Sequence, residues 1–319
     1  MKTLGKTLTW CCLAIILTGI ASAALAEDDA KRPSLWVDLY HGEPIHYEHV
    51  IADLAGVDVV FLGEVHSVKR HHEIQEAILR DLAEKNPKLV LGLEQMEHVH
   101  QPQLDKFNAG EIDFAKLAEA TQWPDRWHNY KQYEGALKIA REFKIPVLAL
   151  NAQSKTIRQV ARGGGVAKLD PEVRKELPED LQLKDPLYEK LLNMYLMVHM
   201  AATPERLRPM LEAQISRDEM MASVLCKFLK SEQGKGRTAV VLCGSGHVSY
   251  GLGTVSRVAR RLPEAKYRVV LPSESGDLVL TESQKAASRP ITITHEQLRE
   301  INRPIADYLH VIGIKSAEE

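Results

Sequence analysis

The chain has 319 residues, of which 45% are hydrophobic and 26% are charged, as in an ordinary globular protein and unlike a disordered one. Its 43 acidic residues nearly balance its 41 lysines and arginines, so the charge argues against a nucleic-acid partner or a strongly anionic membrane surface. The length allows one large domain or two small ones with a substantial hydrophobic core.

The first 26 residues have the pattern of a signal peptide. Lys2 and Lys6 form a basic start, residues 8–20 are mostly apolar, and residues 24–26 form a small-residue cleavage site. The apolar run is too short for a comfortable membrane span. We therefore expect an exported, periplasmic protein with a mature chain of residues 27–319. Whether that chain associates with the membrane stays open.

The sequence contains four cysteines, and two of them, Cys11 and Cys12, lie in the expected signal peptide. Of the other two, Cys226 falls in a helical pattern and Cys243 at the end of a predicted strand. We therefore expect two buried thiols rather than a disulfide, although an exported location would allow a disulfide to form.

After a polar stretch at residues 27–50, the mature chain is predicted to alternate strands and helices. Apolar runs of strand length occur at residues 57–62, 89–93, 145–150, 238–242 and 267–271. Helical periodicity occurs at residues 71–82, 97–127, 130–143 and 255–262. The first two strands and the helix between them complete a strand-helix-strand unit, for which we expect a parallel pair.

Residues 152–236 contain helical patterns only, and we expect a helical insertion there. Residues 308–312 are predicted to add an edge strand. The predicted fold class is therefore α/β. We expect a single domain over residues 27–319, in which helices flank a mainly parallel central sheet and a helical subdomain lies over the carboxyl ends of the strands.

Acidic and histidine side chains follow three of the predicted strands. Glu64 and His66 come after the first strand, Glu94 after the second, and His247 after the fourth. Because the carboxyl ends of parallel strands lie along one edge of a sheet, these side chains are expected to meet in one cleft. Two imidazoles and two carboxylates suit a divalent metal, and equally suit acid-base chemistry without one. Each residue alone would also fit an ordinary polar turn.

Glycines accompany two of these strand ends, at Gly63, Gly244 and Gly246. They allow positive φ angles and close backbone approach, so that a helix N-terminus can follow at once and offer its free N–H groups to an anion.

A predicted helix at about residues 204–230 carries Gln214, Arg217, Asp218 and Met221 on one stripe. Leu211 and other apolar residues lie beside that stripe. Two interpretations are open. Arg217 and Asp218 either face inward, with the strand-end groups as partners, or form an exposed ion pair of less than about 0.5 kcal/mol.

A second helical pattern is rich in apolar and aromatic residues. It indicates a packed amphipathic helix, but its composition would also suit the wall of a haem pocket: Tyr188, Leu191, Leu192, Met194, Tyr195, Val198 and His199.

Taken together and in chain order, residues 61–66, 71–75, 91–96, 148–152, 213–222 and 244–248 resemble the ChaN family of haem-binding, iron-uptake proteins. That family shares a superfamily with the Tiki and TraB metalloproteases and the erythromycin esterases. The resemblance implies a parallel-sheet α/β fold with a helical subdomain. It also implies a homodimer that holds haem at its interface through Tyr and His side chains, without assigning those ligands to positions in this chain.

Two features depart from the family pattern. Ser67 and Val68 stand where the family commonly has Asp-Asn, and Arg217 stands where a Trp often precedes the helical Asp.

Two alternative functions are therefore considered. The first, favoured by the resemblance, is an exported haem-binding protein of iron or haem uptake, with the haem at a homodimer interface and the outer-membrane haem-uptake machinery as a further partner. The candidate cofactor-binding residues are those of the cleft: Glu64, His66, Glu94, Arg217, Asp218 and His247.

The alternative, which the residues alone would favour, is a metal-dependent hydrolase that acts as a protease or an esterase. In it a divalent metal is bound by His66, Glu94 and His247, and Glu64 serves as base or further ligand. Whether the protein is an enzyme stays open at this stage.

Overall fold

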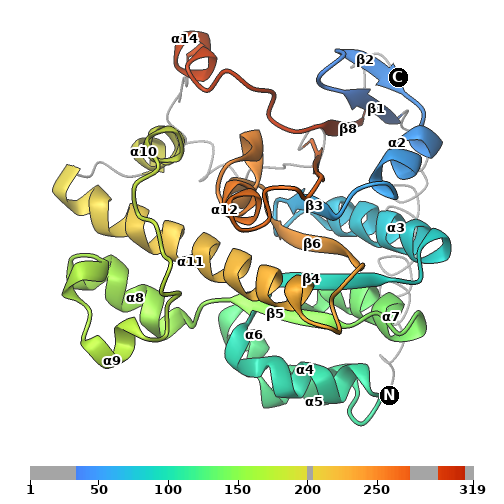
Figure 1. Cartoon of the computed structure of the whole chain (residues 1–319), viewed down its shortest axis with the longest axis horizontal. Helices are drawn as coiled ribbons and strands as arrows, with labels where there is room; N and C mark the ends of the chain where they lie inside the picture. Colours follow the sequence, from blue (N-terminus) through green and yellow to red (C-terminus); the bar gives the residue numbers. More distant parts are fainter. Residues whose placement is uncertain (1–33, 200–203, 274–293, 313–319) are drawn as a thin grey trace, which may run out of the picture.

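The structure is a computed structural model that describes residues 34–199, 204–273 and 294–312, without the side chains of 195–199 and 204–206. The expected signal peptide lies outside these residues. One sheet of eight strands runs through the molecule, with helices on both of its faces (Figure 1). No helix in the described ranges is long and apolar enough to cross a membrane.

The strands follow the order β2-β1-β8-β7-β3-β6-β4-β5 across the sheet. The six strands from β8 to β5 in this order are parallel to one another. The strand β1 is antiparallel to β8 on one side and to β2 on the other. Their bounds are β1 Ser34–Asp38, β2 Glu43–Ile45, β3 Val59–Glu64, β4 Leu89–Glu97, β5 Val147–Asn151, β6 Thr238–Gly244, β7 Tyr267–Pro272 and β8 Tyr308–Ile312.

The α-helices of the described residues lie mostly between the strands. They are α2 Tyr47–Leu54, α3 Lys69–Lys85, α4 Gln101–Asn108, α5 Phe114–Ala120, α6 Trp123–Arg126, α7 Glu134–Glu142, α8 Ser154–Gly163, α9 Pro171–Arg174, α10 Pro186–His199, α11 Pro204–Lys230, α12 Thr254–Arg261 and α14 His295–Arg299. Short 3-10 helices are η1 His98–His100, η2 Tyr130–Tyr133, η3 Val166–Lys168, η4 Ser245–His247 and η5 Ser249–Gly251.

Alternation along the strands builds two apolar layers. On β3, Val60 and Leu62 pack with α2, α3 and α7 on one face, whereas Val59 and Phe61 pack with α11 and α12 on the other. Successive side chains of a strand point to opposite faces, so a strand that is buried on both faces is apolar throughout. The prediction of an α/β fold with a mainly parallel sheet is confirmed.

Two topological predictions were wrong, and one hairpin was missed. β3 and β4 do not pair with each other, because β6 lies between them and pairs in parallel with both. β8 is not an edge strand, because β1 pairs along its free side. The hairpin β1-β2 was missed, since its polar sequence gives no apolar run of strand length.

The helix α11 has the bounds that its sequence pattern predicted. Its 27 residues include Pro209 in the first turns. The second half packs Met221, Leu225 and Cys226 on the sheet, and the first half reaches the carboxyl ends of the strands. Cys226 and Cys243 are both free and buried, as predicted.

Candidate functional site

The carboxyl ends of three adjacent strands, β3, β6 and β4, bring the predicted polar residues together. Glu64 ends β3, Glu94 lies in β4, and His247 lies in η4 directly after β6. All three side chains are buried, with exposed fractions of 2%, 4% and 7% respectively. The order of the strands thus produces the convergence that the sequence predicted, and we call these residues with their partners the strand-end cluster.

The strand-end cluster has two halves, and Glu64 is the central residue of the first half. Its Oε1 atom lies 2.6 Å from Nδ1 of His66 and accepts a hydrogen bond of 3.1 Å from Nε2 of Gln95. The hydroxyl of Tyr133 also donates to Oε1. Nδ1 of His72 lies 3.4 Å from Oε2, so His72 is the histidine of the 71–72 pair that faces the site. Three side chains therefore meet Oε1 of this buried carboxylate, whereas Oε2 has no hydrogen-bond partner among the described residues.

His247 is the hub of the second half. Its Nε2 atom lies 3.2 Å from Oε1 of Glu94, and its Nδ1 atom lies 2.7 Å from Oδ1 of Asp218. Asp218 in turn accepts hydrogen bonds of 2.8 Å from the hydroxyls of Tyr188 and Thr254. Both ring nitrogens of His247 are thus occupied by carboxylates, and the ring is fixed in position.

Gly244 joins the two halves. Its backbone N–H donates to Oε2 of Glu94 over 2.6 Å. A Cβ atom at Gly244 would lie 2.9 Å from Cε1 of His66, so a larger residue would force the imidazole to move from its place against this backbone. The expected close approach is confirmed here. The positive φ that glycine allows is not used, because Gly244 has φ −59° and neither Gly63 nor Gly246 has a positive φ.

The electrostatics of the second half favour a permanent ion pair. Burial favours the neutral forms, but the carboxylates of Glu94 and Asp218 outweigh it and raise the pKa of His247 to about 10. The same pairing outweighs burial at Glu94 and holds its pKa at about 2. His247 therefore keeps its proton at neutral pH, which makes it a poor general base.

His66 is the member of the cluster that reaches solvent. Its side chain is 40% exposed, and its ring packs edge-on against Trp127 with 4.8 Å between the centroids. Although burial opposes the charged form, the hydrogen bond to Glu64 raises the pKa of His66 above its usual value. The side-chain amide of Asn129 donates to its backbone carbonyl.

The polar stripe of α11 faces inward, as the first of its two interpretations expected. Asp218 binds His247, and the amide nitrogen of Gln214 lies 3.2 Å from the same ring. Arg217 does not pair with Asp218 but donates to Oδ1 of Asn151 over 3.3 Å, and Asn151 donates to the backbone carbonyl of Glu94. Burial lowers the pKa of Arg217.

Sequence patterns missed several partners of the cluster. Tyr133 lies in η2 and Thr254 begins α12, and neither position is marked by a strand end or a polar stripe. The helix α10 is a packed amphipathic helix over its described side chains, in which Tyr188 adds the bond to Asp218. The side chains of Tyr195, Val198 and His199 lie outside the described residues.

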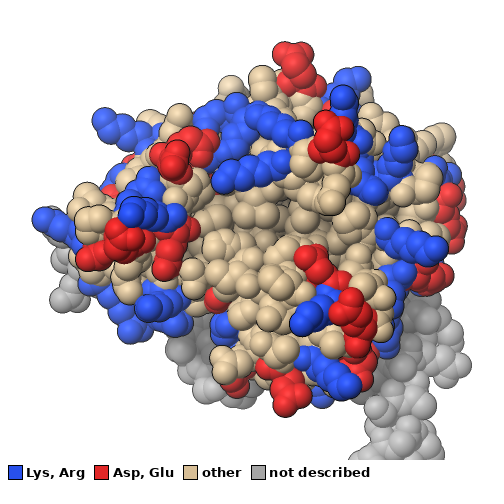
Figure 2. Space-filling view, turned by 60° about the horizontal axis from the view of Figure 1, so that its bottom comes forward, with Lys and Arg blue, Asp and Glu red and all other residues tan. Residues whose placement is uncertain are grey.

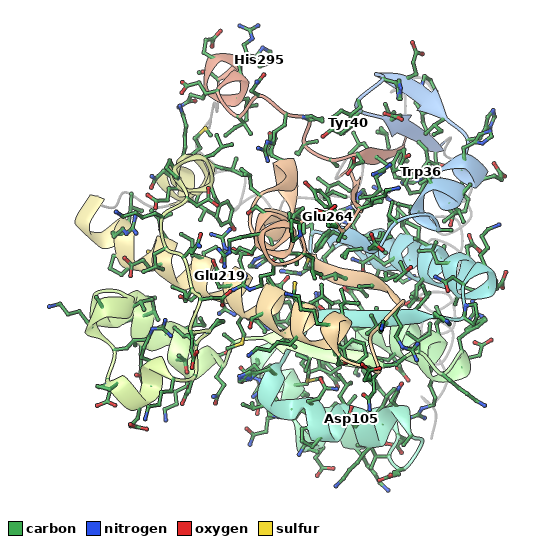
Figure 3. All side chains as sticks on the ribbon, in the orientation of Figure 1. Trp36, Tyr40, Asp105, Glu219, Glu264 and His295 are labelled. Carbon is green, nitrogen blue, oxygen red and sulfur yellow. The ribbon has the colours of Figure 1, made fainter. Side chains whose placement is uncertain are left out.

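Beside the cluster, Glu219 forms a second buried network that the sequence did not indicate. It is fully buried on α11 and lies 2.6 Å from a guanidinium nitrogen of Arg261 and 2.8 Å from one of Arg260 (Figure 3). Nε of Arg257 lies 3.3 Å from the other carboxylate oxygen. These pairs connect α11 to α12. Because Asp218 precedes Glu219 on α11, they also help to hold Asp218 in position.

No group of three or more His, Cys, Asp and Glu side chains in the described part of the chain is arranged to hold a metal ion. In the set His66, Glu94 and His247, both nitrogens of His247 bind carboxylates instead. The metal alternative therefore gains no support from these residues.

The surface outside the cluster carries both signs of charge. Figure 2 shows lysines and arginines interspersed with acidic side chains around a hollowed, uncharged area.

Comparison with known proteins gives a family match. Residues 50–258 match the family model described as haem-binding uptake, Tiki superfamily, ChaN. No curated protein matches the sequence. The structure is similar to that of ChaN of Campylobacter jejuni, which shows cofacial haem binding, with a TM-score of 0.64 and 20% identity over 89% of this chain and 98% of that one. At this identity the likeness shows the fold.

A more distant likeness connects the chain to a mutant of the erythromycin esterase EreC in its open conformation. Its TM-score is 0.46 at 11% identity, over 89% of this chain and 99% of that one, and it carries no functional argument.

Proposed function

We propose that this chain, which belongs to the haem-binding uptake family ChaN of the Tiki superfamily, binds haem in iron uptake. The observation that carries the proposal is the family match over residues 50–258, which is well over half of the chain. The fold that the chain shares with ChaN of Campylobacter jejuni, whose structure shows cofacial haem binding, supports it. When bound, haem supplies the iron that such a protein would carry.

The proposal extends to place and assembly. Export to the periplasm rests on the signal-peptide pattern of residues 1–26, and association into a homodimer with haem at its interface rests on the family resemblance. A haem-binding protein in that compartment would exchange haem with the uptake machinery of the outer membrane.

The strand-end cluster is proposed to be mainly a scaffold in this function. Glu94, Asp218 and His247 bind one another, so both ring nitrogens of His247 are taken and unavailable to a haem iron. His66 is the exception, because it reaches solvent with Nδ1 fixed by Glu64. A hydrogen-bonded Nδ1 orients a histidine whose other nitrogen binds metal, so His66 is the cluster residue to test for haem contact.

Titration of the purified chain with ferric haem, followed by absorbance and light scattering, tests the proposal. Saturable growth of a Soret band, accompanied by a doubling of mass, supports haem binding in a dimer. An unchanged haem spectrum at micromolar concentrations would refute haem binding, and a haem-saturated species with the mass of one chain would refute the dimer alone. Export is tested separately by sequencing the N-terminus of periplasmic protein, which should begin near residue 27.

A further inference from the structure

We infer that a pocket along α8 binds a phosphate-bearing anion, with Arg158 and Arg162 on one wall and Lys168 on the other. The site is additional to haem binding, and nothing in the proposed function uses it. The helix α8 lies beside α9 at the lower left of Figure 1 and packs on the flank of α11.

One face of α8 is cationic. Lys155, Arg158 and Arg162 follow one another at spacings of three and four residues, which places them on one stripe of the helix. All three are exposed. The other face carries Ile157 and Val160, which are buried in an apolar cluster with residues of α11. Packing of the apolar face therefore holds the three cations toward solvent.

The second wall of the pocket is the turn after α8. Gly164 and Gly165 have φ angles of +90° and +100°, which glycine adopts without steric cost. The turn leads into η3, where Cγ of Lys168 lies 3.5 Å from the position of a Cβ atom at Gly164. Glu212 on α11 fixes the turn, because its carboxylate accepts the backbone N–H of Val166 over 2.8 Å. Lys168 is therefore held at the end of the stripe of α8.

The pocket between these walls is electropositive. Its volume is about 510 Å³, within the roughly 300–1,000 Å³ of small-molecule sites. Asp170 is the one acid of its described lining, and Oδ1 of Asp170 accepts the backbone N–H of Glu172 at the start of α9 over 2.8 Å. Four cations and one carboxylate give the lining a net charge of +3: Lys155, Arg158, Arg162, Lys168 and Asp170.

The four cations are available to a ligand. None of their side chains forms an ion pair or a hydrogen bond with a residue that the structure describes. Just beyond the pocket, by contrast, Lys175 on α9 pairs with Glu172 over 2.6 Å. Like charges three and four residues apart on a helix repel one another and destabilise it. An anion in the pocket would relieve that repulsion, so the uncompensated charge indicates a ligand.

Phosphate is the anion that fits these donors. Guanidinium groups bind phosphate oxygens in a bidentate geometry, and lysine ammonium groups add compact positive charges. A net charge of +3 exceeds what a single carboxylate would neutralise and suits a ligand with two or more negative charges. Soluble phosphorylated compounds and the headgroups of anionic phospholipids share this chemistry.

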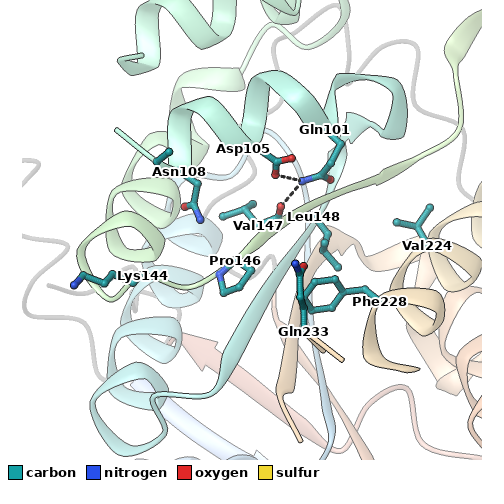
Figure 4. Close-up of a pocket in the computed structure, with 11 residues that line it drawn as sticks. Gln101, Asp105, Asn108, Lys144, Pro146, Val147, Leu148, Val224, Phe228 and Gln233 are labelled. Carbon is teal, nitrogen blue, oxygen red and sulfur yellow. Dashed lines mark hydrogen bonds between the residues drawn. The ribbon is translucent and has the colours of Figure 1, made fainter. Parts of the chain in front are cut away.

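The pocket between α4 and the end of α11 does not have this character. Its volume is about 560 Å³, and its described lining has one cation, Lys144, and one carboxylate, Asp105 (Figure 4). Gln101 donates hydrogen bonds of 2.8 Å to Asp105 and to the carbonyl of Val147. Because its two charges cancel, this pocket has no net attraction for an anion.

Calorimetric titration of the purified chain with inorganic pyrophosphate tests the inference. The wild type should bind saturably at about 50 mM NaCl and more weakly at about 500 mM, because salt screens exposed charges. Replacing both lysines of the pocket, Lys155→Gln with Lys168→Gln, should weaken binding at least about tenfold. Arg158→Gln should weaken it by a similar factor, because a bidentate donor is lost.

The matched control is Lys227→Gln with Lys230→Gln. It removes two exposed lysines of α11 that likewise have no partner among the described residues and do not line the pocket. This variant should bind pyrophosphate as the wild type does. All substituted positions are exposed, and circular dichroism should show that each variant is folded.

Vesicles distinguish the two sources of phosphate. Sedimentation of the wild type with phosphatidylglycerol vesicles but not with phosphatidylcholine vesicles, lost in the Lys155→Gln, Lys168→Gln variant, would assign the pocket to lipid headgroups. Pyrophosphate binding without sedimentation would assign it to a soluble phosphorylated ligand. Either result supports a phosphate site.

Three results would overturn the inference. The first is a wild-type chain that neither binds pyrophosphate nor sediments with the anionic vesicles. The second is equal affinity in the pocket variants and the control variant. The third is citrate binding as tight as that of pyrophosphate, which would show a site for anions in general and not for phosphate.

Discussion

Nε2 of His247 lies 3.2 Å from Oε1 of Glu94, in a buried ion pair that joins two strand ends of the sheet. Asp218 on α11 closes the pair from the other side of the ring at 2.7 Å. The three residues therefore connect the sheet to the helix that covers it. Carboxylate and histidine side chains that are typical of an active site therefore stabilise the fold here.

Replacement of His247 should destabilise the protein strongly. His247→Gln removes the positive charge between two buried carboxylates, and breaking a buried pair in this way costs about 3–5 kcal/mol. Denaturant unfolding should show a loss of that size. His128→Gln, at an exposed histidine, is the control and should change the free energy of unfolding by less than about 0.5 kcal/mol. Equal stability of the two variants would contradict the ion pair.

The same pair predicts how stability depends on pH. The pKa of His247 is raised in the folded state to about 10 from 6.5, so its contribution is complete below 6.5 and is lost as the pH rises through 10. The pKa of Glu94 is lowered to about 2 from 4.5, so its contribution is complete above 4.5 and is lost as the pH falls through 2.

Between pH 6.5 and 10, therefore, the wild type should lose up to about 1.4 kcal/mol per pH unit relative to His247→Gln. Unfolding measured at several pH values in that window checks this slope. Parallel pH profiles for the two proteins would show that His247 is not held protonated.

A methyl group added at two nearby glycines should destabilise the protein at one position and be neutral at the other. In Gly244→Ala the new Cβ would meet the ring of His66 at 2.9 Å, so the ring must move and about 1–3 kcal/mol of stability should be lost. At Gly246 nothing lies within 4 Å of the added atom, and Gly246→Ala should be close to neutral. Thermal unfolding of the pair of variants provides the comparison, and a neutral Gly244→Ala would count against the packing of His66.

The hydroxyl of Tyr133 should contribute to stability separately from its buried ring. Tyr133→Phe keeps the buried ring but takes one donor from the carboxylate of Glu64, at a cost of about 1–3 kcal/mol. Tyr130→Phe, which removes a hydroxyl without a described partner, is the control. If both variants unfold at the same denaturant concentration, the donor to Glu64 is dispensable.

The sequence predicted those features that depend on local pattern. The buried strands β3, β4, β5, β6 and β7 are apolar runs, and in a parallel sheet their ends coincide, so Glu64, Glu94 and His247 were expected together. The inward face of α11 followed from the spacing of Gln214 and Asp218, although the pattern alone allowed an exposed pair.

Features that depend on distant partners were not predictable. The insertion of β6 between β3 and β4 is decided by which strands bury each other best, and the strand-helix-strand rule does not encode that choice. Tyr133 reaches Glu64 from a 3-10 helix without periodicity. The left-handed Tyr250 has no sequence signature, because its conformation comes from the bond to Ile305.

The central claim is that this chain binds haem, and titration of the purified full chain with ferric haem tests it most directly. A Soret band that grows with protein and saturates is the predicted result. A spectrum that stays that of free haem, at concentrations where the protein remains folded, would contradict the claim.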